Sequence, residues 1–287
     1  MTFKQTLPKR RHLIALGTLA LAGCSATGAL NVLVPRGTYR AEGGIAYGND
    51  PRQRLDVYTP LEPRPDAPVA VFFYGGAWTR GDRASYRFVG EALASAGIVA
   101  VVADYRLSPE VRWSAILEDC SDAVNWVFRN AQRLGASPER IHLIGHSAGG
   151  YNAAMLALDP RWLARHGLQP RQLAGWIGIA GPYNFLPIVD PDSQRAFDWP
   201  ATPDNSQPIA HVTAQAPRTL LLAAREDTVV NAQRNSVELA QRLRGAGVDV
   251  TLEVLDGVNH VTIIGAMASP LRGLAPVRDS VTRFILA

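Results

Sequence analysis

The stretch RIHLIGHSAGGYNAAMLAL, residues 140–158, changes its pattern at the centre. It begins as an apolar run typical of a buried strand, places Gly145, Ser147 and Gly149 within five positions, and resumes as an apolar run of helical length. Small residues at such a junction permit a sharp turn, because glycine has no Cβ to collide with the flanking strand or helix. We therefore predict a strand, a tight turn at Ser147 and a helix, in that order.

The rest of the chain alternates in the same way. Short apolar runs predict strands at 69–74, 98–105, 140–145, 175–181, 218–224 and 250–256, and longer segments predict helices at 84–96, 113–134, 147–158, 231–246 and 276–286. Nearly continuous apolar strands separated by helices are typical of a mostly parallel sheet covered by helices on both faces. With 287 residues, of which 47% are hydrophobic, we expect one α/β domain of catalytic size.

Residues 145–149, GHSAG, match the G-x-S-x-G pattern of a nucleophile elbow, which leaves a strand and enters a helix. A serine hydroxyl needs a base, and the base needs a carboxylate to orient it. On a parallel sheet of this kind the three follow the chain order serine, acid, histidine. Asp227 in REDTVV and His260 in GVNH each follow a predicted strand, so Ser147, Asp227 and His260 are the predicted catalytic residues.

Other residues compete for two of these roles. Glu226 is the alternative acid, and Asp227 taken alone could serve only as a turn former. His142 lies inside a predicted strand and His146 inside the elbow, so neither reaches the hydroxyl from the opposite side, and His211 follows no predicted strand. The joint occurrence in the right order favours the aspartate and histidine that follow the two strands.

An oxyanion forms when serine attacks a carbonyl, and it needs hydrogen-bond donors held in place beforehand. The amide of Ala148, at the start of the predicted helix, is the first donor. The second should come from YGGAW, residues 74–78, because two glycines after a buried strand let backbone amides turn inward.

Six motifs together resemble the α/β-hydrolase carboxylesterases with an HGG-type loop: YGGAW (74–78), DYRLSPE (104–110), GHSAGG (145–150), GPYN (181–184), REDTVV (225–230) and GVNH (257–260). The similar groups are bacterial esterases, hormone-sensitive-lipase-like enzymes and kynurenine-formamidase-like enzymes. The resemblance extends over residues 45–287, and residues 47–60 resemble the entry strands of that family. It implies the α/β-hydrolase fold and a serine carboxylesterase.

The resemblance also implies an oxyanion hole made by the amides of Gly76, Ala77 and Ala148, with Gly75 as the turn residue. Tyr74 stands where the family commonly has histidine, a departure that affects the support of the loop rather than the chemistry.

Two aromatic residues, Trp78 and Tyr183, are expected to line the substrate pocket, although either could instead be a packing residue. The long, irregular segment 187–208 could cover the site. We expect hydrolysis of a small-molecule ester with a short or medium acyl chain, through an acyl-enzyme and without a metal or organic cofactor.

Three alternatives to this activity remain. An amidase or arylformamidase would use the same triad. A peptidase is less favoured, because no propeller-like domain precedes the predicted catalytic domain. A noncatalytic surface lipoprotein would keep the fold without the chemistry.

The first residues have the layout of an export signal: a basic segment ending in KRRH, an apolar run too short to span a bilayer, and small residues. LAGC at 21–24 resembles a bacterial lipobox, which makes 1–23 a lipoprotein-type signal peptide and Cys24 a lipid anchor. We expect an exported, membrane-anchored protein, in the outer membrane facing the periplasm if the cell is Gram-negative, with a tether at 24–40 and a catalytic domain at 41–287. Export through the general or the twin-arginine route is compatible with this sequence.

Charge and cysteine content exclude two further classes of function. The formal net charge of +4 falls to zero without residues 1–23, which hold four basic and no acidic residues, so no basic stripe remains to bind nucleic acid. Apart from Cys24 the chain has only Cys120, which we expect to be a small buried helix residue and not a nucleophile. The oligomeric state has no signature in this sequence.

Overall fold

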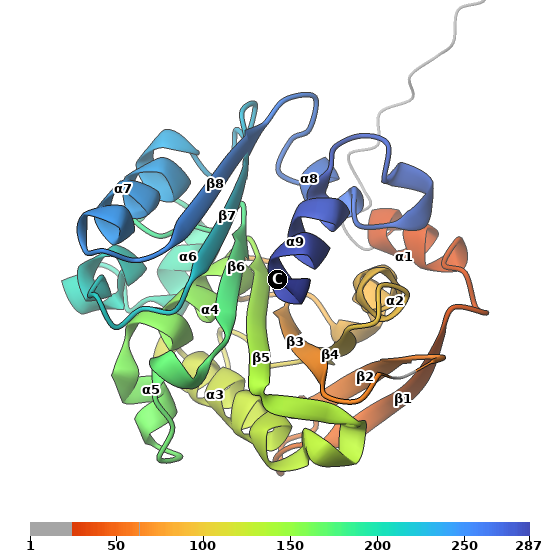
Figure 1. Cartoon of the computed structure of the whole chain (residues 1–287). Coiled ribbons are helices and arrows are strands. Elements are labelled where there is room, and N and C mark those ends of the chain that lie inside the picture. The colour runs from red at the N-terminus through yellow and green to blue at the C-terminus, as the bar shows by residue number, and fades with distance from the viewer. Residues whose placement is uncertain (1–24, 63) are drawn as a thin grey trace, which may run out of the picture.

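A computed structural model describes residues 25–287 except residue 63 (Figure 1). The predicted signal peptide, 1–23, and Cys24 lie outside the described residues. Eight strands form one sheet in the order β1-β2-β4-β3-β5-β6-β7-β8. Their bounds are β1 Tyr39–Ala46, β2 Arg54–Pro60, β3 Ala67–Phe73, β4 Val99–Ala103, β5 Ala136–His146, β6 Gly175–Ile179, β7 Thr219–Ala224 and β8 Val250–Leu255.

Two strand directions meet in this sheet. The β1–β2 and β2–β4 pairs are antiparallel, whereas β4, β3, β5, β6, β7 and β8 run parallel to one another. Each residue of β3 and β4 is buried, as expected for strands with helices on both faces. The predicted α/β fold with a mostly parallel sheet is therefore confirmed, and all parallel strands present their carboxyl ends at one edge, called here the carboxyl edge.

The helices correspond closely to the apolar segments that separate the strands. Their bounds are α1 Ser25–Val32, α2 Arg87–Ala94, α3 Trp113–Asn130, α4 Ala148–Leu158, α5 Pro160–Ala164, α6 Pro191–Ala196, α7 Glu238–Gly245, α8 Thr262–Gly265 and α9 Val277–Leu286. Helices α2 and α9 pack together on one face, with α9 in front of the sheet in Figure 1, and α3 and α4 pack together on the other. The short helices α1, α5, α6 and α8 were not predicted.

Two positions at the turn between β5 and α4 leave no room for a side chain. A Cβ added to Gly145 would lie 1.9 Å from the carbonyl oxygen of Gly149, and one added to Gly149 would lie 2.0 Å from that of Phe73. Because these neighbours are backbone atoms of the central strands and the elbow helix, they cannot move aside. The glycines thus let α4 lie directly against β3 and β5.

The segment expected to be a tether is ordered over most of the part that is described. Residues 25–32 form α1, whose Asn31 side chain donates to the carbonyl of Ala84 (2.7 Å) and accepts from the amide of Phe88 (3.2 Å). Val34 is buried in the core and β1 begins at Tyr39. The composition of 25–40 did not indicate this helix, because small residues form a helix here only by packing on the domain. No helix in the described ranges is long and apolar enough to span a bilayer.

Candidate active site

The three predicted catalytic side chains meet at the carboxyl edge. His260 Nε2 lies 2.8 Å from Ser147 Oγ, and His260 Nδ1 lies 2.7 Å from Asp227 Oδ2. Both distances are within hydrogen-bonding range, although the residues are 33 and 113 positions apart along the chain. With a proton on Nδ1 donated to the carboxylate, Nε2 is free to accept from the serine hydroxyl.

Ser147 lies at the point where β5 turns into α4. Its φ of 54° and ψ of −124° are outside the regions that a non-glycine residue ordinarily occupies. The surrounding backbone imposes this conformation: the Ser147 amide donates to the carbonyl of Ile179 on β6 (2.9 Å), and the Ser147 carbonyl accepts from Tyr151 in the first turn of α4. The strain places the hydroxyl where His260 can reach it.

Asp227 is held ionised by its hydrogen-bond donors. Burial alone would raise the pKa of this carboxyl, whose side chain is only 1% exposed, but the hydrogen bonds from His260 and the amides of Val230 and Val229 outweigh burial and lower its pKa. One oxygen accepts from the two amides and the other faces the imidazole. The carboxylate is therefore fixed in direction as well as in charge.

The loop after β3 has positive φ angles at three consecutive residues, a conformation that L side chains rarely adopt. Gly76 has φ +135°, where a Cβ would lie 2.1 Å from the carbonyl oxygen of Arg80, and Ala77 and Trp78 follow with φ of 49° and 60°. Gly75 packs directly on the elbow, since its Cβ would lie 2.8 Å from that of Ser147. Within the described residues the amides of Gly76 and Ala77 have no hydrogen-bond acceptor. These two amides, which the sequence suggested as oxyanion donors, therefore remain available to an added acceptor.

Tyr74, the departure from the family pattern, is buried in a polar network under this loop. Its hydroxyl donates to Asp104 Oδ1 and accepts from Arg52 Nη2, both at 2.8 Å, and its backbone carbonyl accepts from the hydroxyl of Tyr105 at 2.7 Å. Arg52 also donates to the carbonyl of Gly81, at the far end of the loop (2.8 Å). Burial together with the nearby Asp104 carboxylate raises the pKa of the phenol well above its ordinary range, so it remains a donor.

His146 is a functional candidate that sequence reasoning set aside. It is too enclosed to act as a base on Ser147, but its Nε2 donates to the backbone carbonyl of His260 at 2.9 Å. Its Nδ1 is buried without a partner in the described structure and would lie 3.2 Å from a Cβ on Gly75. Burial lowers the pKa of His146 to about 3, so the ring is neutral and links the elbow to the histidine loop. The sequence signal that could have indicated this role was the histidine inside GHSAG.

The two aromatic residues expected to line a pocket are packing residues in this structure. Trp78 is 2% exposed and donates to Asn152 Oδ1 (3.0 Å), and Tyr183 is fully buried with its ring edge-on to Trp176. Tyr183 fills the space beside Gly178 of β6 and Gly181, which follows that strand. A Cβ on Gly178 would lie 1.9 Å from the Tyr183 hydroxyl oxygen. Of the two interpretations left open, burial supports packing.

A cluster of four rings packs one helical turn from Ser147. It consists of Trp78, Tyr151, Phe185 and Phe197, with ring centroids 4.7 to 5.9 Å apart. Phe197 belongs to the segment expected to cover the site, which contains α6. Asp192 of α6 binds Arg80, just past the oxyanion loop, at 2.6 Å. The cover segment therefore lies against the loop that carries the free amides.

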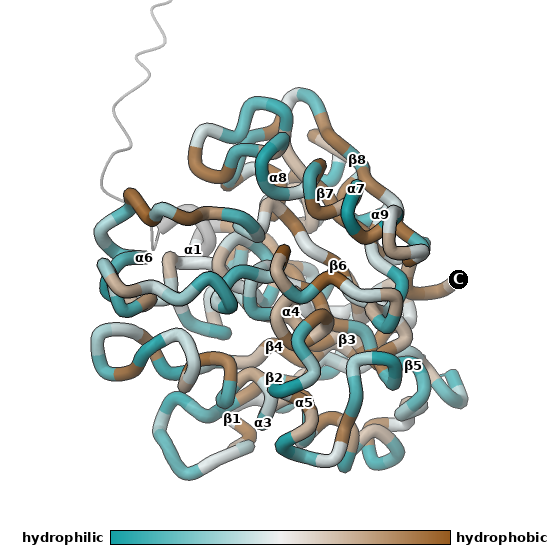
Figure 2. Tube along the Cα trace, turned by 90° about the vertical axis from the view of Figure 1, so that its left-hand side faces the viewer, coloured by the Kyte–Doolittle hydropathy of each residue, from teal (hydrophilic) through white to brown (hydrophobic). Residues whose placement is uncertain are grey.

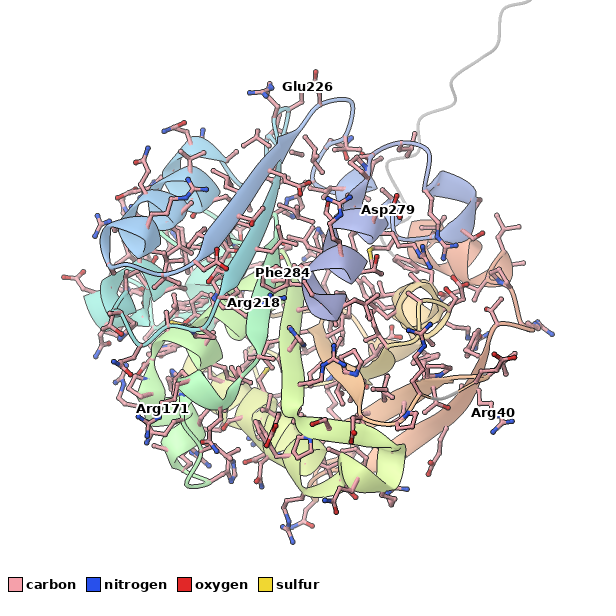
Figure 3. All side chains as sticks on the ribbon, viewed as in Figure 1. Arg40, Arg171, Arg218, Glu226, Asp279 and Phe284 are labelled. Atoms are coloured by element: carbon pink, nitrogen blue, oxygen red, sulfur yellow. The ribbon has the colours of Figure 1, made fainter. Side chains whose placement is uncertain are left out.

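The competing residues lie elsewhere. Glu226 is exposed and points away from the molecule at its tip (Figure 3). His142 packs near Phe284, and burial lowers its pKa to about 4. His211 binds the carbonyl of Asn205 (2.8 Å).

Cys120 is a free, buried residue of α3, as predicted, and burial raises the pKa of its thiol well above the ordinary range. No cluster of metal-ligating side chains occurs within residues 25–62 and 64–287.

Comparisons of the chain with known proteins agree on one kind of enzyme. A family model described as BD-FAE matches residues 55–186. A probable isoprenylcysteine alpha-carbonyl methylesterase of Oryza sativa subsp. japonica is 30% identical over 253 residues, which cover 80% of this chain and 58% of that protein. Esterase LipC of Mycobacterium tuberculosis is 31% identical over 220 residues, covering 70% and 54%. The chain spans about half to three fifths of the length of the first curated relatives it matches.

Solved structures share the fold. A truncated carbohydrate esterase from gut microbiota superimposes with a TM-score of 0.74 at 20% identity, covering 88% of this chain and 99% of that one. Inhibited esterase B from Lactobacillus rhamnosis gives a TM-score of 0.75 at 20% identity, covering 90% of each chain.

Proposed function

The chain belongs to the α/β-hydrolase carboxylesterase family, and we therefore propose that it is a serine esterase that hydrolyses carboxylic esters. Ser147 is the nucleophile, His260 the general base and acid, and Asp227 the residue that orients the imidazole. The observation that carries this proposal is the continuous hydrogen-bonded path from Asp227 through His260 to Ser147 Oγ.

The reaction follows from this geometry. As Ser147 Oγ attacks the ester carbonyl, its proton passes over 2.8 Å to His260 Nε2, and the Asp227 carboxylate stabilises the imidazolium that forms. The tetrahedral oxyanion accepts hydrogen bonds from the amides of Gly76, Ala77 and Ala148. His260 then protonates the leaving alcohol, and a water deprotonated by the same imidazole hydrolyses the acyl-enzyme.

Short or medium acyl groups are the proposed substrates. The aromatic cluster beside Ser147 is already packed against itself, with Trp78 and Phe197 almost without exposed surface, so a long chain has no open channel along that side. A panel of p-nitrophenyl esters from acetate to palmitate tests this, and we expect kcat/KM to fall beyond medium length. A maximum at palmitate would contradict it.

Ester rather than amide cleavage is proposed, because an alcohol leaves the tetrahedral intermediate more readily than an amine does. The panel is therefore run beside the matching anilides and an aryl formamide. Faster turnover of the formamide than of the acetate ester would assign the same triad to an arylformamidase.

We also propose that the protein is exported and lipidated at Cys24, on the sequence pattern of residues 1–24. The support is the basic segment, the short apolar run and LAGC. Cys24→Ser should release the protein from the membrane fraction of the producing cell, or block its maturation, and mass spectrometry of the N-terminal peptide checks for the acyl chains. An unmodified cysteine in the wild-type protein would end this part of the proposal.

A further inference from the structure

Most of the exposed apolar side chains of this protein lie at the end of α1 or in segments that follow the carboxyl end of a parallel strand. Nine large apolar side chains are exposed in the described chain: two lie at the end of α1, and five lie in the segments that follow β6, β7 and β8. We call these seven the apolar rim: Val32, Leu33, Val189, Trp199, Val229, Val261 and Leu274, which are 45 to 84% exposed. Leu61 and Leu286, at the ends of β2 and α9, are the other two.

Two members of the apolar rim adjoin the triad directly. Val261 follows His260 in the chain, and the amide of Val229 is one of the two that bind Asp227. Val189 and Trp199 flank α6 in the cover segment, which Asp192 ties to Arg80 beside the oxyanion loop. Exposed apolar side chains that share one side of a molecule can form an interaction surface.

Helix α1 joins the N-terminus to the same edge. Its Asn31 binds the carbonyl of Ala84, in the segment that leaves the carboxyl end of β3. Leu30 approaches α8, since a Cβ on Gly265 would lie 4.0 Å from its Cδ1. Figures 1 and 2 show α8 in the upper part of the molecule, toward which β7 and β8 point, and α1 lower, slightly above mid-height. The first turn of α8 begins two residues after His260.

The position of α1 removes the slack from any anchor at Cys24. Cys24 is the residue before α1, so its Cα lies about 3.8 Å from that of Ser25. A flexible tether of 17 residues would have let the domain turn freely, whereas a lipid at residue 24 holds the carboxyl edge near the bilayer. Ser25, where the described chain begins, is separated from Val32, the first member of the apolar rim, by the length of the eight-residue helix α1.

We propose that the apolar rim rests on the membrane surface, so that the active site opens toward the bilayer and receives its ester substrate from the lipid phase. This inference rests on the proposed esterase function for the nature of the substrate, and on the proposed anchor at Cys24 for bringing the domain to the membrane. Apolar side chains of a protein that rests on a bilayer contact the boundary between headgroups and acyl chains, while the ion pairs around them stay in the headgroup layer. The orientation follows from the apolar rim and α1 together, and neither alone would fix it.

Trp199 provides a direct optical test. It is 55% exposed, whereas the other five tryptophans are buried or half-buried. The full-length protein is reconstituted into phosphatidylethanolamine–phosphatidylglycerol vesicles, with and without phosphatidylcholine brominated on its acyl chains. The difference between wild type and Trp199→Phe isolates the Trp199 emission, and we expect brominated lipid to quench about half of it or more. Equal emission with and without bromine overturns the proposal.

Turnover provides the second test. Val32→Ser/Leu33→Ser/Leu274→Ser should lower hydrolysis of a medium-chain ester dissolved in the vesicles by about tenfold, because the mouth no longer faces the lipid. Hydrolysis of p-nitrophenyl acetate in the aqueous phase should stay the same. The control, Leu61→Ser/Leu286→Ser, replaces two leucines that are 42 and 44% exposed and are not members of the apolar rim, and it should change neither rate. It is matched in residue number and type to Leu33→Ser/Leu274→Ser, whose leucines are 60 and 45% exposed and which should still lower the rate on the lipid-borne ester.

The outcomes separate the two proposals. If the wild-type protein fails to hydrolyse p-nitrophenyl acetate, the proposed function fails, while the Trp199 quenching still tests the membrane face. If the control variant loses as much lipid-borne turnover as the rim variant, the apolar rim has no special role. Dimerisation that shields Trp199 from an aqueous quencher in the absence of vesicles would assign the surface to a second copy and overturn the membrane assignment.

Discussion

The two halves of the candidate catalytic site are built by different means. On the nucleophile side, β3, residues 141–146 of β5 and α4 are buried, and glycines at 75, 145 and 149 allow close backbone contacts. The acid–base side is formed by the loops after β7, which is buried, and β8, which is largely half-buried, and hydrogen bonds fix its side chains. Sterics therefore fix the serine and polar contacts fix the histidine, so the halves should fail in different ways.

The largest expected effect is on the nucleophile side. Ser147→Ala should reduce kcat for p-nitrophenyl acetate by about 10⁴-fold or more, because no other side chain can form the acyl-enzyme. The hydroxyl contributes little to packing, so the thermal midpoint should remain close to that of the wild type. Near-normal turnover by this variant would remove the proposed mechanism. Labelling by a fluorophosphonate probe should disappear in parallel.

On the acid–base side, Asp227→Asn should lower kcat by about 10⁴-fold. The amide cannot stabilise the imidazolium, and its nitrogen would favour the wrong tautomer of His260. Glu226→Gln is the matched control, since that carboxylate is exposed and should leave kcat unchanged. Equal losses in the two variants would show that the carboxylates act together.

The steric character of the nucleophile side is tested by Gly149→Ala. The added methyl would overlap the carbonyl of Phe73, and we expect the free energy of unfolding to fall by about 3 kcal/mol or the protein to be recovered unfolded. Urea denaturation of this variant is compared with that of Gly245→Ala, at the end of α7, where a Cβ meets no atom within 4 Å. That control should be neutral or slightly stabilising.

The link between the halves is tested by His146→Phe. This removes the donor to the His260 carbonyl while keeping a flat ring, and kcat should fall about tenfold with KM nearly unchanged. His146→Gln can still present an N–H at the Nε2 position and should recover part of the loss. An equal loss of kcat in both variants, or a change confined to KM, would contradict a positioning role for this hydrogen bond.

The smallest effect concerns acid stability on the acid–base side. The pKa of Asp227 is lowered in the folded protein, so its contribution to stability is present above about pH 4, where the unfolded carboxyl is ionised, and is lost as the pH falls through the folded pKa. Asp227→Asn lacks this contribution, and its unfolding free energy should depend less on pH below 4. Identical pH dependence of the two proteins would contradict it.

The same contrast explains what could be predicted from sequence. The sheet, Ser147, Asp227 and His260 are encoded locally, by apolar runs and by the residues that end them, and the structure brings the three side chains together. Helix α1 could not be predicted, because its contacts are with residues more than fifty positions away. His146 binds a carbonyl 114 residues later, which no local pattern specifies.

The burial of Trp78 and Tyr183 was equally out of reach. Aromatic residues near a predicted site can face a ligand or the core, and only the packing of Trp176 and Asn152 around them decides which. The substrate-facing surface of the site is therefore the part for which sequence was least informative.

The concealed thiol of Cys120 has a practical consequence for spectroscopy. Because it is the only cysteine in the described chain, and is both buried and poorly ionised, a cysteine introduced at any exposed position would be the sole readily labelled group there. Within residues 25–287, nitroxide or fluorophore pairs can thus be attached across the domain without first replacing Cys120, and distances between them can be followed while substrate turns over.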